Sequence, residues 1–292
     1  MPTTQSRRSR TSNHITKRQP AGRSGHPGQR RFAAFMLTIV AIIGIGIAGL
    51  KATALNENYT TQSLTTGENL TTLETQVQKA AGNSLTDIPG AGTLVSRTIS
   101  ADTTKALATA TIHSIYNNTS AKIDFTTMDK EVKSAISGST GSTGLSSTLG
   151  SAIASAILPT LHDYFNKQLS NATVEARNKY QTIASTVQTA ILPLLVIAVI
   201  LAIWMLVAAG GLGRFLHGIG WIALLAGLLG AAATQLAAKL PNLDTLTSNM
   251  PELEPVLKSY LADVVNHVSG YYLIAAAAGL VVLLVTIPWR NR

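Results

Sequence analysis

Long uncharged apolar segments alternate with polar segments along the chain. A helix needs roughly 20 apolar residues to cross the hydrocarbon core of a bilayer, and four segments reach about that length. They cover residues 32–50, 191–212, 215–238 and 271–289. Because the core of a soluble protein rarely contains four such segments, the pattern predicts an all-α membrane protein with a bundle of four transmembrane helices.

The polar segments predict the rest of the architecture. Residues 51–190 form a mainly helical extracytoplasmic domain between the first and second spans. Residues 239–270 form a short amphipathic helical loop between the third and fourth spans, and residues 213–214 turn the chain between the second and third. Residues 1–31 and 290–292 are terminal tails, of which the first is basic and too polar to fold.

Several residues mark helix boundaries inside the predicted domain. Asp102 is a candidate N-cap for a helix that continues to Ile115. Thr126 and Asp129 resemble a capping box in which Asp replaces the preferred Glu. The Gly/Ser/Thr-rich spacer at residues 137–151 has too few apolar residues to fold alone, so we expect a hinge or a disordered loop there.

The clearest helical periodicity lies in residues 160–188, which predict a coiled-coil-like stalk of roughly 40 Å leading toward the second span. Its apolar positions are Leu161, Phe165, Leu169, Ala172, Ala176, Tyr180, Ile183 and Val187. Pro193 is placed to kink the junction between stalk and span. A second amphipathic helix starts at Pro255. Its apolar face contains Leu257, Tyr260, Leu261, Val264, Val265 and Val268.

We expect these two apolar faces to bury each other as an antiparallel helix pair next to the membrane. Each helix adjoins a span, so their ends are tethered close together. Burial of each large apolar side chain contributes about 1.5–3 kcal/mol, which favours the pair. The alternative is that either face lies on lipid headgroups or docks onto another protein.

Small residues recur three or four positions apart in the spans, where they let helices approach closely. The positions expected to pack in the membrane are Gly44, Gly46, Gly49, Ala223, Gly227, Ala231, Ala275 and Gly279. The three glycines of the first span also spell G-x-G-x-x-G, the fingerprint of a dinucleotide site. That site needs its glycines between a strand and a helix start, whereas these lie inside an apolar helix, so we interpret them as packing positions.

The charge distribution predicts the orientation. The net charge is +9, and the two tails together with Arg214 hold eleven Lys or Arg residues and no Asp or Glu. Because basic residues accumulate on the cytoplasmic side of membrane proteins, we expect both termini in the cytoplasm. Tyr271 and Tyr272 at the outer end of the fourth span and Trp289 at its inner end are typical of aromatic belts.

The first apolar segment has two interpretations. Its 19 residues exceed the 7–15 of a secretory signal and suffice to span a bilayer, which favours an uncleaved anchor. Ala52-Thr53-Ala54 is also a passable cleavage site. Cleavage after Ala54 would leave three spans.

Composition and motifs argue against catalysis. The chain has no cysteine, which excludes disulfides, thiolate metal sites and a Cys nucleophile. His113, His162 and His267 lack the spacing of metal ligands, and no phosphate-loop or nucleophile motif occurs. We therefore predict no catalytic residue, no cofactor and no metal. No ionisable Asp, Glu, Lys or Arg lies in a span core, which argues against ion-coupled transport.

The expected surroundings follow from the same features. The basic tail at residues 1–31 should lie on anionic lipid, and nucleic acid is not an expected partner. A cysteine-free, Thr/Ser-rich exported domain is typical of a bacterial cell envelope, Gram-positive in particular. The predicted localisation is thus the cell membrane, with several spans.

The order of spans and domains carries two resemblances. The order of elements resembles that of the ABC-type mechanotransmission permeases, including those of cell division. In that order, a span is followed by a large outer domain, two spans, a small outer loop and a last span. That resemblance implies an ATPase partner, but the inner segment "GGLGRFLHGIG" is short for gripping one. The layout also resembles uncharacterised four-span integral membrane proteins of Gram-positive bacteria, which implies no activity. We expect a non-enzymatic protein that presents its helical domain to another envelope protein or to a second copy, with a permease-like subunit as the alternative.

Overall fold

The computed structural model describes residues 27–119, 123–142, 147–237 and 253–288, and within them the regular structure is entirely α-helical. The helices are α1 (Pro27–Ala52), α2 (Glu57–Leu64), α3 (Gly67–Asn83), α4 (Ala91–Thr98), α5 (Ala101–Tyr116), α6 (Thr126–Ser142), α7 (Ser147–Ala209), α8 (Leu212–Ala237) and α10 (Glu254–Thr286). Four of them, α1, α7, α8 and α10, are long and apolar enough to cross a membrane. The prediction of an all-α chain with four candidate spans is confirmed.

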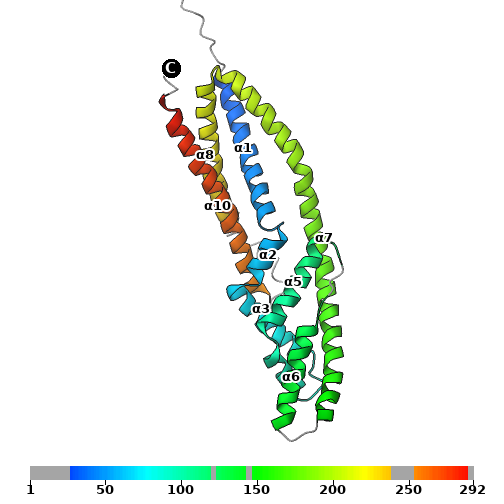
Figure 1. The fold of residues 1–292 in the computed structure, drawn as a ribbon. Helices are drawn as coiled ribbons and strands as arrows, with labels where there is room; N and C mark the ends of the chain where they lie inside the picture. The colour runs from blue at the N-terminus through cyan, green and yellow to red at the C-terminus, as the bar shows by residue number, and fades with distance from the viewer. Residues whose placement is uncertain (1–26, 120–122, 143–146, 238–252, 289–292) are drawn as a thin grey trace, which may run out of the picture.

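The molecule is elongated (Figure 1). One end holds α1, α8, α10 and the C-terminal part of α7, which together we call the membrane bundle. The other end holds α2 to α6 and the N-terminal part of α7, which we call the helical domain. The start of α1, the turn between α7 and α8 and the end of α10 all lie at the same end of the bundle, away from the helical domain.

The stalk predicted at residues 160–188 is part of a much longer helix. α7 has 63 residues and continues through Pro159 and Pro193, so it extends about 94 Å at 1.5 Å per residue. It runs from the helical domain into the membrane bundle, curving along its length (Figure 1). The stalk and the second span are therefore one continuous element, although each proline removes one helical hydrogen bond.

The turn that follows α7 lies at Gly210 and Gly211, earlier than the predicted residues 213–214. Gly210 has φ of +65°, a left-handed conformation that glycine adopts at little cost. The helix therefore ends at the first residue that can reverse the chain, and Arg214 falls in the first turn of α8.

The expectation that the spacer at residues 137–151 lacks regular structure is wrong at both of its ends. Residues 137–142 continue α6 and residues 147–151 begin α7, whereas residues 143–146 lie outside the described residues. Buried Ile136 and Ala154 anchor the two helices next to the spacer. Because extending an existing helix costs far less than nucleating one, polar residues can continue it.

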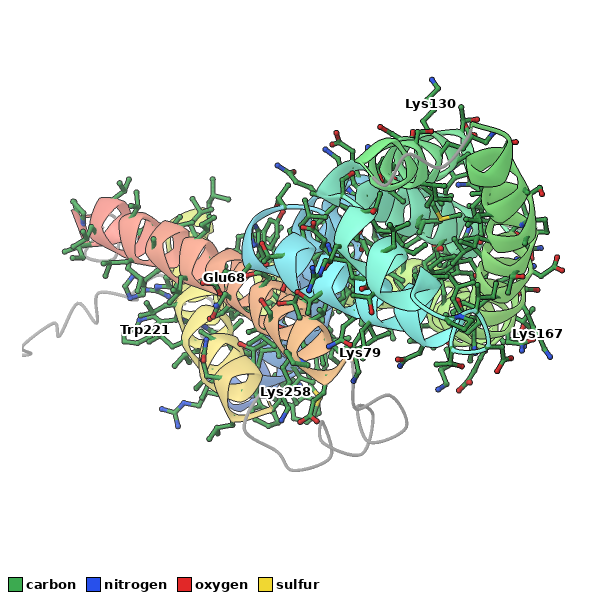
Figure 2. All side chains as sticks on the ribbon, turned by 90° about the horizontal axis from the view of Figure 1, so that it is seen from below. Glu68, Lys79, Lys130, Lys167, Trp221 and Lys258 are labelled. Atoms are coloured by element: carbon green, nitrogen blue, oxygen red, sulfur yellow. The ribbon has the colours of Figure 1, made fainter. Side chains whose placement is uncertain are left out.

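The apolar face of the stalk packs inside the helical domain. The core of that domain contains Ala81, Leu85, Val95, Ile99, Leu107, Met128, Val132, Ile136, Ile157, Leu161 and Phe165. Leu169 is partly buried against it, and Tyr180 is half-buried further along α7, while Ile183 is 51% exposed. Lys130 and Lys167 point away from the domain surface (Figure 2).

The predicted pairing of this face with residues 257–268 is wrong. α7 packs mainly on α6, α5 and α1, whereas α10 packs on α8, α1, α3 and α2. The side chains of α10 that become buried are Val256, Val264, Val268, Tyr272, Ala276, Gly279 and Leu283. These buried residues lie on one face of α10, which continues from the outer loop into the span. Because that face contacts α8 in the span, the same face is buried along the whole helix. Leu257, Leu261 and Val265 lie beside that face and are half-buried.

Glycines allow the backbones of α8 and α10 to pack closely together. A Cβ atom at Gly227 would lie 2.5 Å from both the Ala276 nitrogen and the Tyr272 oxygen, and one at Gly279 would lie 2.5 Å from the Leu224 nitrogen. These neighbours are backbone atoms and cannot move aside. Ala231 is buried nearby, while Ala223 and Ala275 are half-buried.

The glycines of α1 face two different helices. Gly46 lies against the hydroxyl of Tyr272 and Gly49 against Val268, both on α10, whereas Gly44 faces Leu194 on α7. α1 therefore contacts α10 and α7 through small residues, as well as packing on α8.

Tyr272 does not belong to an aromatic belt, and that prediction is wrong. Its side chain is only 4% exposed, and its hydroxyl donates a 2.6 Å hydrogen bond to the Ile42 carbonyl of α1. Gly46 and Gly230 leave the space that the ring fills. The neighbouring Tyr271 is 40% exposed, as expected for a residue on the outer surface of a bundle.

Two predicted helix caps also differ from the structure. The N-cap of α5 is Ser100, whose hydroxyl accepts hydrogen bonds from the backbone of Asp102 and Thr103. Glu131 of α6 in turn accepts from the Ser100 backbone and hydroxyl and from the Thr103 hydroxyl. A carboxylate at a helix N-terminus is favoured by the helix dipole, so α6 fixes the start of α5.

Asp129 does not complete a capping box with Thr126. The Asp129 carboxylate lies 2.7 Å from the Nε2 atom of His162 on α7, and Thr126 donates to Asp124 instead. The His162 ring stacks on Phe125 with a centroid separation of 4.2 Å. These contacts join α6 to α7 within the helical domain.

Candidate functional site

The helical domain meets the membrane bundle where α1 passes into α2. α1 ends at Ala52, and the buried Thr53 hydroxyl donates a 2.7 Å hydrogen bond back to the Gly49 carbonyl. Asn56 then caps α2, its side chain accepting from the backbone of Asn58 and Tyr59. This local sequence starts a new helix only a few residues beyond the span, and it fixes the direction of α2.

Three hydroxyl groups and one carbonyl form a continuous series at this point. The hydroxyl of buried Thr60 on α2 lies 2.7 Å from the Tyr116 hydroxyl on α5 and 2.9 Å from the Tyr260 hydroxyl on α10. The Tyr116 hydroxyl also lies 2.6 Å from the Ala54 carbonyl, just after α1. We call these four residues the hydroxyl chain.

The direction of each hydrogen bond in the hydroxyl chain follows from the number of protons. A carbonyl only accepts, so Tyr116 donates its single proton to Ala54. Thr60 must then donate to the Tyr116 oxygen, which leaves Tyr260 to donate to Thr60. Each hydroxyl proton is used once, and hydrogen bonds arranged in series strengthen one another.

Other contacts reinforce the link between α2 and α10. The Ser63 hydroxyl donates a 2.8 Å hydrogen bond to the Asp263 carboxylate. The Tyr59 hydroxyl lies 3.2 Å from the Nδ1 atom of His267, and the two rings meet edge to face at 5.0 Å. The face of α2 toward α10 is thus polar and specifically paired.

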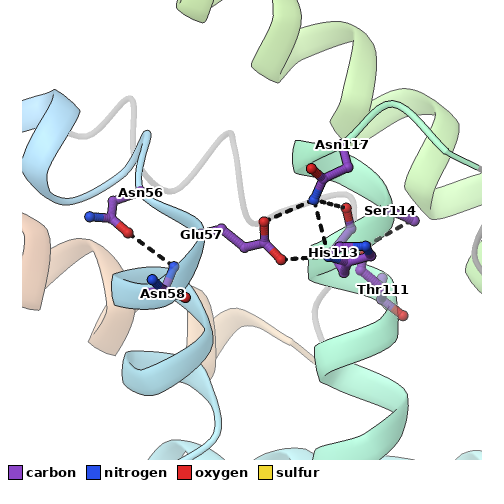
Figure 3. A network of polar contacts seen from close by, with 7 residues as sticks. All are labelled: Asn56, Glu57, Asn58, Thr111, His113, Ser114 and Asn117. Carbon is purple, nitrogen blue, oxygen red and sulfur yellow. Dashed lines mark hydrogen bonds and ion pairs between the residues drawn. The ribbon is translucent and has the colours of Figure 1, made fainter.

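A second network joins α2 to α5 (Figure 3). The Glu57 carboxylate lies 2.7 Å from His113 Nδ1 and accepts a 2.9 Å hydrogen bond from the Asn117 amide. The His113 side chain is 61% exposed, so this pair contributes little to stability. The Glu57 network lies at the exposed edge of the contact between α2 and α5, and the hydroxyl chain lies in the interior of the same contact.

α7 also reaches the junction. Its Tyr180 ring lies 4.5 Å from the Tyr116 ring, centroid to centroid. Burial raises the pKa of Tyr116 well above its usual value, the largest of the causes acting on it. The Tyr116 phenol therefore stays protonated and can keep donating to Ala54.

The hydroxyl chain is suited to mechanical coupling. Its members come from α2, α5, α10 and the end of α1, and every proton already has an acceptor. In the described parts of the chain, no three His, Asp or Glu side chains gather in a way that could hold a metal ion. What the geometry provides is a specific, water-poor contact between the bundle and the domain.

The sequence-predicted packing residues and the hydroxyl chain are different sets. Leu161 and Phe165 lie in the domain core, and Gly227 and Gly279 lie in the bundle core. Of the hydroxyl-chain residues, the sequence places Tyr260 in an apolar face and Ala54 in a possible cleavage site, but it assigns neither to this contact. The sequence offers one weak indication of this contact, which is the position of Tyr116 at the end of a helix.

Comparisons with known proteins found no matching family model, no similar curated protein and no similar solved structure.

Proposed function

We propose that this chain is a multi-pass protein of the cell membrane that presents its helical domain, in a fixed orientation outside the cytoplasm, to a protein partner. Its role is that of a scaffold or interaction module and involves no catalysis. Four apolar helices support a membrane location. The cysteine-free composition supports a bacterial envelope, Gram-positive in particular.

The hydroxyl chain is the observation that carries this proposal. A domain on a single flexible linker would move freely, whereas this domain is joined to the bundle by α7, by the α1–α2 connection and by α10. Tyr260 and Thr60 bond directly across the contact. Such a contact is useful where the orientation of the domain matters to what binds it.

The positions of basic residues support the proposed orientation. Arg30 and Arg31 at the start of α1 and Arg214 at the start of α8 belong to the end of the bundle opposite the helical domain. Basic residues favour the cytoplasmic side. In intact cells, an impermeant thiol reagent should label Glu68→Cys and fail to label Arg214→Cys, and the reverse pattern would refute the orientation.

The exposed surface of the domain offers mixed charge. Lys130 on α6 and Asp163 and Lys167 on α7 are exposed, and Glu175 pairs with Lys179 on α7. Figure 2 shows Lys130 and Lys167 projecting from the surface of the domain. A surface with interspersed charges suits a polar protein interface better than a lipid surface. The partner is another envelope protein or a second copy of this chain.

In-cell photo-crosslinking tests the proposed function. A photoreactive amino acid at Lys130 or Lys167 should give a discrete adduct in cells. Its yield should fall in a Thr60→Val background and persist with Thr60→Ser, because only the latter keeps the hydroxyl chain. Two differently tagged copies then show whether the adduct is a second copy. Absence of a discrete adduct at both positions, or an adduct indifferent to Thr60→Val, would refute the proposal.

The permease-like alternative has less support. The connection between α7 and α8 consists of Gly210 and Gly211, and it exposes little surface for an ATPase to grip. For this reason we do not propose an ATPase partner.

A further inference from the structure

A cleft of about 610 Å³ lies in the membrane bundle between α1 and α8. On α1, the residues that line the cleft recur about once per helical turn from Arg30 to Ile42. On α8, the lining residues recur in the same way from Gly218 to Leu229. Met205 of α7 also lines it. Such spacing places all the lining residues of each helix on a single face, so the cleft is a groove along the helix pair.

The groove has one basic end and an apolar body. Arg30 and Arg31 line the end where α1 begins, and none of the described residues that line the groove is acidic. Arg30 is half-buried and Arg31 is exposed. Within the described residues, neither guanidinium forms an ion pair or a hydrogen bond, so both remain available to bind a phosphate, which arginine does with paired hydrogen bonds.

The dimensions suit a lipid. The α1 wall runs from Arg30 to Ile42, which is about 18 Å along the helix, and the hydrocarbon core of one leaflet is about 15 Å thick. The rim is apolar and open to the surroundings of the bundle, since Phe35 is 61% exposed and Leu229 is 55% exposed. A molecule with an anionic head and a long hydrocarbon chain matches both the charge and the length of the groove.

Polar groups within the groove fit the same occupant. Thr38 turns its hydroxyl onto the Ala34 carbonyl of its own helix, which leaves a methyl group for the groove. Trp221 lines the wall opposite and is 48% exposed. The ring of Trp221 therefore reports on whatever occupies the groove.

We infer that this groove binds an anionic phospholipid, with the phosphate at Arg30 and Arg31 and an acyl chain along the walls of α1 and α8. The site does not depend on the proposed scaffold function. It also differs from a general attraction of the basic tail to lipid, because it requires two particular arginines at the end of a shaped groove.

Fluorescence quenching in vesicles tests the inference. Trp204→Phe and Trp289→Phe leave Trp221 as the only tryptophan of the full chain. The protein is placed in phosphatidylcholine vesicles that contain a small, equal fraction of brominated phosphatidylglycerol or brominated phosphatidylcholine. Because both leaflets have one composition, the direction of insertion does not matter. Brominated phosphatidylglycerol should quench Trp221 several-fold more effectively than brominated phosphatidylcholine.

Substitutions show whether the preference for phosphatidylglycerol depends on the arginines of the groove. Arg30→Gln combined with Arg31→Gln should lower the relative association of phosphatidylglycerol roughly 25-fold, since each cation beside an anionic lipid contributes roughly a fivefold preference. Quenching by brominated phosphatidylcholine should stay unchanged, which shows that the variant still inserts. Arg214→Gln is the matched control, because Arg214 is exposed at the same end and does not line the groove.

Three results would overturn the inference. The first is equal quenching by the two lipids in the unmodified protein. The second is a preference that survives the double arginine substitution. The third is a loss with Arg214→Gln as large as that with Arg31→Gln alone, which would mean that surface charge and not the groove selects the lipid.

Discussion

Thr60 on α2 donates its hydroxyl proton to the oxygen of Tyr116 on α5, across 2.7 Å. The two residues are 56 positions apart, and the bond lies between the donor Tyr260 and the acceptor Ala54. Through this one threonine, α2 is bonded both to α5 inside the helical domain and to α10, the helix that leads into the last span. These bonds help to hold the helical domain and the membrane bundle together as one connected body.

Thr60→Val should destabilise the protein, whereas Thr60→Ser should not. Valine has nearly the shape of threonine but leaves the Tyr260 proton without an acceptor and the Tyr116 oxygen without a donor, and each buried unpaired polar group costs about 1–3 kcal/mol. Serine keeps the hydroxyl. Thermal unfolding in detergent would measure the difference. Equal midpoints for valine and serine would mean that the hydroxyl chain contributes nothing to stability.

Tyr116 should make stability depend on alkaline pH. Because burial raises its pKa in the folded state, its contribution is fully present below pH of about 10, where an unfolded tyrosine titrates, and is lost as pH rises through the raised value. Tyr116→Phe should therefore remove part of the alkaline loss of stability. The absorbance of tyrosinate can be followed as pH rises in the wild-type protein and in the Tyr116→Phe variant. The difference in absorbance between the two should appear only at pH values above those at which ordinary tyrosines titrate. A difference centred near 10 would contradict the buried environment.

The sequence was sufficient to predict the spans and the faces of several helices, because periodicity depends on local spacing. It predicted burial of Leu161 and Phe165 for this reason. Periodicity does not identify the partner of a face, and the expected pairing of α7 with residues 257–268 was wrong. The buried face of α10 is set by the approach of Gly227 and Gly279, a contact between helices that only the three-dimensional arrangement defines.

Gly227→Ala should destabilise the contact between α8 and α10. The added methyl group would meet backbone atoms at 2.5 Å, and overpacking of this kind costs about 1–3 kcal/mol. Gly270→Ala on α10 is the matched control, since a Cβ atom there meets nothing within 4 Å and alanine favours a helix by up to about 1 kcal/mol. The unfolding midpoint should fall for Gly227→Ala and hold or rise for Gly270→Ala. A similar fall in both variants would argue against close packing at Gly227.

Glu131→Gln should weaken the start of α5. The carboxylate accepts from the Ser100 backbone and from two hydroxyls at the N-terminus of that helix, and loss of its charge should cost about 1–2 kcal/mol. Glu175→Gln removes a carboxylate whose pair with Lys179 is exposed and should leave the free energy of unfolding almost unchanged. Chemical denaturation would compare the two, and equal effects would show that Glu131 is only a surface charge.

The hydroxyl chain itself was beyond sequence reasoning. Thr60 and Tyr260 are 200 positions apart, and neither belongs to a motif. Tyr272 shows the same limit, because its position next to Tyr271 suggested an interfacial residue. Its burial depends on the space left by Gly46 and Gly230 on two other helices.

We conclude that the membrane bundle holds the helical domain in one orientation, and a measured distance between the two parts shows whether this claim is right. Because the chain has no cysteine, spin labels attach only at Lys167→Cys on the domain and Gln235→Cys near the end of α8, both exposed positions. Double electron–electron resonance on the protein in nanodiscs should give one narrow distance distribution, which broadens with Thr60→Val and stays narrow with Thr60→Ser. A broad or multi-peaked distribution in the protein with Thr60 intact would contradict the claim.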